Sequence, residues 1–135
     1  MQRLKTRPQF QAVLNGALIA KTSHFALHRL ELLMAPPEVQ ILFPLNTTWL
    51  GAMAPKRWAK RAVTRNAIKR QIYTVSASFT SPLPQAALLV RLRREFTRKD
   101  FVSATSVALK EAVRTELVLL MQSVLATKNL MPADA

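Results

Sequence analysis

The sequence predicts a single α+β domain in which helices pack on a mixed β-sheet, as a two-layer α-β sandwich. The chain has 135 residues, 50% of them hydrophobic, which suffices for one core and is too short for two domains. Helical and extended hydrophobic patterns follow one another in the order helix, two or three strands, helix, strand, helix. A strand-helix-strand unit near the end of such an order is typical of α+β sandwiches.

The first elements are predicted from caps and turn signals. A short helix is expected at about residues 7–15, because TRPQ at residues 6–9 has the form of a capping box and Gly16 suits the helix end. Apolar runs at residues 24–33, 39–45 and 49–54 predict antiparallel strands. Pro44 interrupts the second run, so the sequence leaves open whether that run is a strand or a loop.

The later elements are predicted from hydrophobic spacing. A helix is expected at about residues 61–78, because Ile68, Ile72, Val75 and Phe79 recur at the spacing of a buried helical stripe. The unbroken apolar run at residues 86–92 is typical of a covered strand, and a final helix is expected at about residues 103–126. Residues 1–128 are therefore predicted to form the domain, with residues 129–135 as a frayed tail.

Positive charge is the main functional signal. The formal net charge is +13, and the stretch KRWAKRAVTRNAIKRQIY at residues 56–73 holds cations but no acid. On a helical wheel the polar residues opposite the apolar stripe lie in an arc of about 140°, and they are Arg65, Asn66, Lys69, Arg70 and Tyr73. No acid occurs between Glu38 and Glu95, so the repulsion among these cations is uncompensated within the segment. A polyanionic partner would compensate it.

Nucleic acid, and RNA in particular, is the favoured polyanion. The element order and the lack of cysteine fit neither a helix-turn-helix nor a zinc module for DNA. A membrane-binding role would need the apolar stripe exposed, whereas a folded domain buries it. RNA-binding sheets often carry stackable rings beside their cations. Each candidate ring could equally belong to the core, and Trp58 could anchor a helix or stack on a base. The candidate rings on the sheet are Phe10, Phe25, His28 and Trp49.

No catalytic or metal-binding group is predicted in the chain. Its seven acidic residues are scattered, without a pair spaced for acid-base chemistry or for a two-metal cluster. His24 and His28 on one strand would stand roughly 13 Å apart, too far to share a metal ion. No apolar run reaches the roughly 20 residues needed to span a bilayer, and no secretory leader is evident, so a cytoplasmic location is expected.

The run Ala62 to Arg70, AVTRNAIKR, resembles the signature helix of the bacterial ribonuclease P protein component. As in that family, Gly51 in a strand and the pair Lys56-Arg57 precede it, and the likeness extends over most of the chain. The resemblance implies a sandwich with a left-handed βαβ crossover, similar to domain 2 of ribosomal protein S5. It also implies a monomeric protein subunit that assembles with a catalytic RNA. That ribonucleoprotein endonuclease cleaves the 5′ leader from precursor tRNA, using Mg²⁺ held mainly by the RNA.

The resemblance also implies roles for particular residues. By the resemblance, the residues expected to contact the catalytic RNA are Arg61, Arg65, Asn66, Lys69 and Arg70. The charge pattern adds three cations that precede the helix and extend this set toward its N-terminus, namely Lys56, Arg57 and Lys60. Those expected to line the cleft for the substrate leader are Phe10, Phe25, His28 and Arg93. Ala67 and Tyr73 depart from the family, which usually has arginine at both positions. The alternative function is a non-catalytic RNA-binding scaffold, such as a ribosomal protein of related fold.

Overall fold

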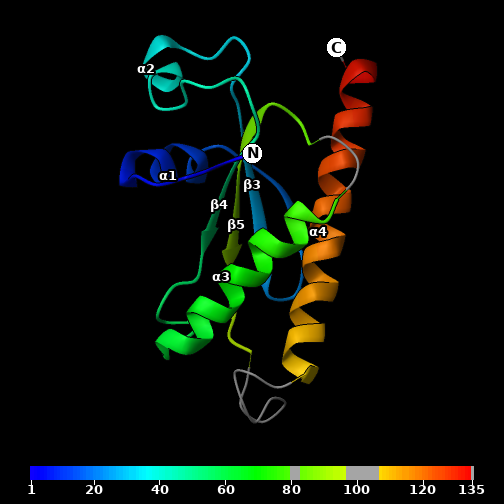
Figure 1. The fold of residues 1–135 in the computed structure, drawn as a ribbon. Coiled ribbons are helices and arrows are strands. Elements are labelled where there is room, and N and C mark those ends of the chain that lie inside the picture. The colour runs from blue at the N-terminus through cyan, green and yellow to red at the C-terminus, as the bar shows by residue number, and fades with distance from the viewer. Residues whose placement is uncertain (80–82, 97–106, 135) are drawn as a thin grey trace.

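The computed structural model describes residues 1–79, 83–96 and 107–134, which form one sheet with helices on both of its faces (Figure 1). The strands are β1 (Gln2–Arg3), β2 (Ala17–Lys21), β3 (Phe25–Glu31), β4 (Trp49–Met53) and β5 (Ala86–Leu92). The helices are α1 (Arg7–Leu14), α2 (Pro37–Gln40), α3 (Ala62–Ala77) and α4 (Val107–Asp134).

The sheet is five-stranded and mixed, in the order β1-β4-β5-β3-β2. Strand β5 pairs in parallel with β4 and antiparallel with β3, and β3 in turn pairs antiparallel with β2. Because α3 connects β4 to β5, these three elements form a βαβ unit on neighbouring strands. The predicted α+β class with a mixed sheet is therefore confirmed.

Strand alternation divides the apolar residues between two clusters. On one face Phe25, Leu27 and Leu88 pack with the stripes of α3 and α4. On the other face Trp49 and Leu89 pack with α1 and with the segment that contains α2. Figure 1 shows α3 and α4 on one side of the sheet and α1 and α2 on the other. The predicted two-layer arrangement is thus incomplete, because helices cover part of the second face as well.

Several predicted elements are confirmed. Strand β5 has the predicted bounds, and α1 and α3 differ from theirs by one residue at each end or less. The capping box before α1 is formed: Gln9 N donates to Thr6 Oγ1 at 3.3 Å, and Thr6 N donates to Gln9 Oε1 at 3.1 Å. Helix α4 runs to Asp134, beyond the predicted end at residue 126, while residues 103–106 lie outside the described part of the chain.

Residues 39–45 are not a strand. The chain there leaves α2 and enters a turn that places Phe43 against the sheet, where the residue is only 4% exposed. The Phe43 ring meets the Trp49 ring edge-on at a centroid distance of 5.5 Å. The amide of Gln9 donates to the carbonyl of Leu42 at 2.8 Å, which ties this segment to α1. The segment therefore closes the second apolar cluster.

Gly16 lies where α1 turns into β2 beneath the backbone of β3. A Cβ at this position would come within 2.6 Å of the Arg29 carbonyl oxygen and 3.0 Å of the Val13 carbonyl oxygen. Backbone atoms cannot move aside as a side-chain tip can, so we expect Gly16→Ala to lower the free energy of unfolding by about 1–3 kcal/mol. Urea denaturation of this variant and of Ser23→Ala, an exposed control, measures the effect. A midpoint equal to that of the wild type would contradict this close approach.

Candidate nucleic-acid interface

Helix α3 has one buried face and one cationic face. Ile68, Ile72 and Val75 of the predicted stripe are buried against the sheet and α4, and Phe79 is partly buried at the same cluster. This part of the prediction is confirmed. The opposite face is exposed to solvent, and it carries Arg61, Asn66, Lys69 and Arg70.

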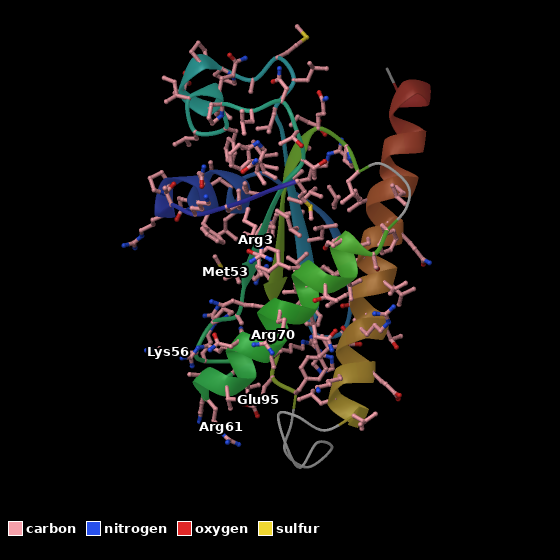
Figure 2. The ribbon with its side chains drawn as sticks, in the orientation of Figure 1. Arg3, Met53, Lys56, Arg61, Arg70 and Glu95 are labelled. Carbon is pink, nitrogen blue, oxygen red and sulfur yellow. The ribbon has the colours of Figure 1, made fainter. Side chains whose placement is uncertain are left out.

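The predicted RNA-contacting cations have no acidic partner among the described residues. The ion pairs found there join His24 to Glu116, at 2.7 Å, and Arg29 to Glu31, at 2.5 Å. Lys56, Arg57 and Lys60 are exposed in the segment that precedes α3. In Figure 2 the labelled side chains of Lys56, Arg61 and Arg70 lie along one side of the molecule. The structure thus joins the loop cations and the helix cations into one surface.

Arg65 differs from the other cations because its side chain folds back onto the backbone. Its Nη1 donates to the carbonyl oxygens of Ala59 and Lys60, at 3.1 and 2.9 Å. These bonds hold the preceding loop against the first turn of α3, where Arg65 itself is only partly exposed. Arg65 therefore positions the loop cations, and its remaining N–H groups stay available to a phosphate.

The residues predicted for the leader cleft do not all share a surface. His28 and Phe25 lie on the same strand three residues apart, so their side chains point to opposite faces of the sheet. Phe25 is fully buried in the cluster under α3 and α4, whereas Phe10 is partly exposed and packs on the opposite cluster. The ring of Phe25 therefore has no exposed surface on the face that carries Phe10 and His28.

Phe10 and His28 remain on one face of the sheet, and Arg91 lies beside His28 on that face. Arg91 Nε donates to His28 Nε2 at 3.2 Å. Strand alternation explains this position, because Arg91 follows Ala87 and Leu89 at two-residue steps. Gly51 makes room for Phe10, since a Cβ at Gly51 would come within 2.9 Å of the Phe10 ring.

Arg93 lies just beyond β5 and is held by the loop before β3. Its Nη1 donates to the carbonyl oxygens of Thr22 and Ser23, at 3.0 and 2.8 Å. Burial lowers the pKa of Arg91, and the charges of Arg57 and Arg93 lower it further. Arg57 and Arg93 are therefore each close enough to Arg91 to repel its charge, so positive charge continues from the loop before α3 to the end of β5.

The charge state of His28 follows from its surroundings. Its ring is buried, with 7% exposed, and desolvation followed by the charge of Arg91 lowers its pKa below the ordinary 6.5. Since Nε2 accepts from Arg91, neutral His28 carries its proton on Nδ1, for which the described residues supply no acceptor.

The lowered pKa of His28 makes stability depend on pH. As the pH falls through 6.5, the unfolded chain takes up a proton at this histidine before the folded chain does. The contribution of His28 to the free energy of unfolding is therefore complete above about pH 6.5 and is lost between that value and the lower pKa of the folded state. Urea denaturation at a series of pH values should show a smaller loss for His28→Gln than for the wild type. Equal losses in the two proteins would contradict the assignment to His28.

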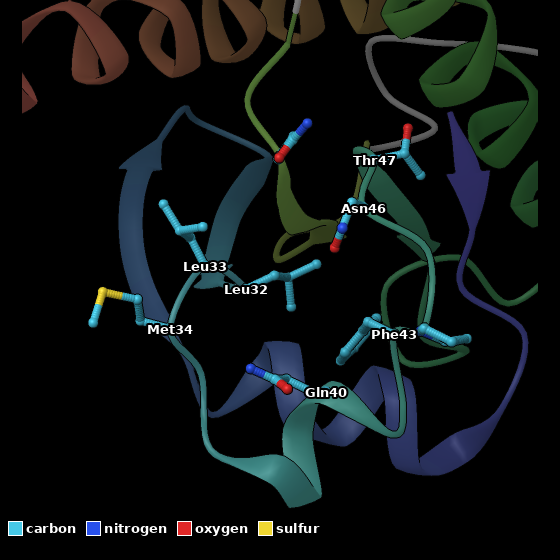
Figure 3. A pocket seen from close by; sticks show the side chains of 9 residues that line it. Leu32, Leu33, Met34, Gln40, Phe43, Asn46 and Thr47 are labelled. Atoms are coloured by element: carbon cyan, nitrogen blue, oxygen red, sulfur yellow. The ribbon is translucent and has the colours of Figure 1, made fainter.

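A separate hollow near α2 has a different character. It has a volume of about 360 Å³, and the side chains that line it include Leu32, Met34 and Phe43 (Figure 3). No lysine, arginine, histidine or acid lines it. It therefore lies outside the cationic surface.

Within the described ranges of the chain, no three histidine, aspartate or glutamate side chains come together as a metal site would require. The same ranges contain no helix with the length and apolar character to cross a bilayer.

A cationic helix face without ion pairs, beside a mixed sheet with partly exposed rings, is characteristic of small α+β proteins that bind RNA. The family model described as Ribonuclease P matches residues 1–116. The ribonuclease P protein component of Bordetella parapertussis is 33% identical over 115 residues, which cover 85% of each chain. The chain therefore belongs to the ribonuclease P protein family.

Other relatives agree with this assignment. The ribonuclease P protein component of a Nostoc species is 35% identical over 95 residues, or 63% of this chain and 66% of the relative. The solved RNase P protein of Staphylococcus aureus superposes with a TM-score of 0.64 at 20% identity, covering 92% of this chain and 97% of that one. A second structure of that protein gives a TM-score of 0.58 at 22% identity, covering 90% and 89%. At such identities these superpositions show the shared fold.

Proposed function

We propose that this chain binds the catalytic RNA of a ribonuclease P ribonucleoprotein through the cationic face of α3 and the loop before it. The family acts in 5′ maturation of tRNA. The observation that carries the RNA contact is the absence of acidic partners, among the described residues, for Arg61, Lys69 and Arg70. Phosphates of an RNA would supply the missing negative charge. The ribosomal-scaffold alternative has no comparable support, since the matching family is Ribonuclease P.

We further propose that the second face of the sheet receives the 5′ leader of precursor tRNA. Phe10 offers a partly exposed ring, Arg91 offers a cation beside His28, and Arg93 offers another just beyond the end of β5. A single-stranded leader needs both stacking surfaces and phosphate partners. Phe25 has no part in this proposal because its ring is fully buried.

The chemistry in this proposal belongs to the RNA. The RNA would hold most of the Mg²⁺, and the protein would raise the affinity for substrate and neutralise phosphate repulsion. The protein alone would be a monomer in the cytoplasm, where it meets precursor tRNA. We also propose that the β4-α3-β5 connection is left-handed, which an experimental structure of the free protein would test.

Reconstitution tests the proposal directly. Purified protein added to its cognate RNA at low Mg²⁺ should increase the rate of 5′ cleavage of precursor tRNA, because the cations replace part of the Mg²⁺ that screens the RNA backbone. The stimulation should shrink as Mg²⁺ is raised. Cleavage rates that do not respond to the protein at any Mg²⁺ concentration would contradict the proposed function.

A further inference from the structure

The N-terminal strand β1 brings an additional arginine to α3. The guanidinium carbon of Arg3 lies 3.9 Å from the centroid of the Tyr73 ring, which is a close cation-π contact. Arg3 comes from the first residues of the chain and Tyr73 from the middle of α3, so only the fold puts them together.

The position of Arg3 is fixed by its neighbours on both sides. Gln2 N donates to the Thr48 carbonyl at 2.9 Å, and Leu4 N donates to the Leu50 carbonyl at 3.0 Å. The Leu4 side chain is only 5% exposed in the cluster under α1. The backbone of Arg3 is therefore anchored on the edge of the sheet, while its side chain is exposed.

Arg3 and Tyr73 border a shallow hollow with two cations of the helix. It has a volume of about 690 Å³ and is lined by Arg3, Lys69, Arg70, Tyr73, Thr74 and Ala77. In Figure 2 the labelled side chains of Arg3 and Arg70 lie on the same side of the molecule, one from β1 and one from α3. The lining thus holds cations, a hydroxyl and an aromatic ring, but no acid.

We propose that this hollow is a binding site for a backbone phosphate of RNA, with Arg3 and Tyr73 as functional parts of it. Stacking on Tyr73 covers one face of the guanidinium plane and leaves its N–H edges free to bind phosphate oxygens in a bidentate manner. Lys69 and Arg70 approach the same hollow from α3, and the Thr74 hydroxyl adds a donor. The cationic surface then extends from α3 to the edge strand β1.

This inference rests on the proposed function, because it assigns one more phosphate contact to the same RNA. The test measures binding of the wild-type protein and of Arg3→Gln to the cognate catalytic RNA over a series of salt concentrations. Arg3→Gln should weaken binding about five- to tenfold and lower the slope of log K against log salt by about 0.7–0.9. The matched control is Arg114→Gln, an exposed arginine on α4, which removes the same charge without touching the hollow.

Variants of Tyr73 distinguish the contribution of its aromatic ring to RNA binding from that of positive charge alone. Tyr73→Leu removes the surface that orients Arg3 and should weaken binding, whereas Tyr73→Phe keeps the ring and should lose less. The double variant Arg3→Gln/Tyr73→Arg moves the cation from the strand to the helix, so the salt slope should return toward the wild-type value. Circular dichroism and urea denaturation verify that each variant is folded.

The possible outcomes distinguish this inference from the proposed function. A wild-type slope for Arg3→Gln, or equal losses for Arg3→Gln and Arg114→Gln, would overturn the phosphate site. If those results occur while a Lys69→Gln/Arg70→Gln variant still loses RNA affinity, the cationic face of α3 stands and only the role of Arg3 fails. If the Lys69→Gln/Arg70→Gln variant also binds RNA like the wild type, the proposed RNA contact fails as well.

Discussion

Replacing Lys69 and Arg70 together by glutamine should weaken binding of the catalytic RNA about 10- to 100-fold at moderate salt. Both side chains are exposed, and the described residues give neither of them an ion pair, so their charges are available to phosphates. Each lost phosphate contact removes about 0.7–0.9 from the salt slope, so this variant should lose about 1.4–1.8. Filter binding or fluorescence titration between low and moderate salt gives both quantities.

The control for this experiment is the double variant Lys110→Gln/Arg114→Gln. It also removes one lysine and one arginine, both exposed, but from α4 instead of α3. It lowers the net charge equally and should change the slope little, because long-range attraction between exposed charges is screened. Equal losses in the two variants would show that only net charge matters, and would contradict a defined RNA-binding face.

Helix α3 shows what could be predicted from sequence and why. A helical wheel depends only on local geometry, so Ile68, Ile72 and Val75 predict the buried side and thereby the cationic side. The wheel does not show that Arg65 binds the carbonyls of Ala59 and Lys60, because that contact depends on the path of the loop. The cationic face of α3 could be predicted from the sequence, whereas the different role of Arg65 among its cations could not.

The elements that the sequence did not predict are those stabilised by contacts with residues far away in the sequence. Strand β1 is two residues long and exists because it pairs with β4, which is far away in the sequence. Strand β2 is mostly exposed and its register with β3 is interrupted between Leu18 and Ala20, so it lacks a clear alternating pattern. Within residues 39–45, Val39, Leu42 and Phe43 pack on the second cluster, and composition alone does not distinguish this arrangement from a strand.

Phe25 is the residue whose role changes most between sequence and structure. Its ring is fully buried, with its centroid 6.0 Å from that of Phe96, and it packs in the cluster beneath α3 and α4. We therefore expect Phe25→Ala to lower the free energy of unfolding by about 3–5 kcal/mol, because a large ring leaves a cavity that the rigid sheet cannot fill. Urea denaturation of the free protein measures this loss.

Two more conservative variants distinguish an effect on protein stability from an effect on substrate binding. Phe25→Leu keeps most of the buried volume, so it should fold and should discriminate between precursor tRNAs with long and short leaders as the wild type does. Phe10→Leu removes a partly exposed ring from the opposite face of the sheet and should reduce that discrimination with a smaller change in stability. Competition between the two substrates for the reconstituted ribonucleoprotein provides the measurement. If Phe25→Leu lost leader discrimination and Phe10→Leu retained it, the leader would have to contact the opposite face of the sheet, and the proposed cleft would be wrong.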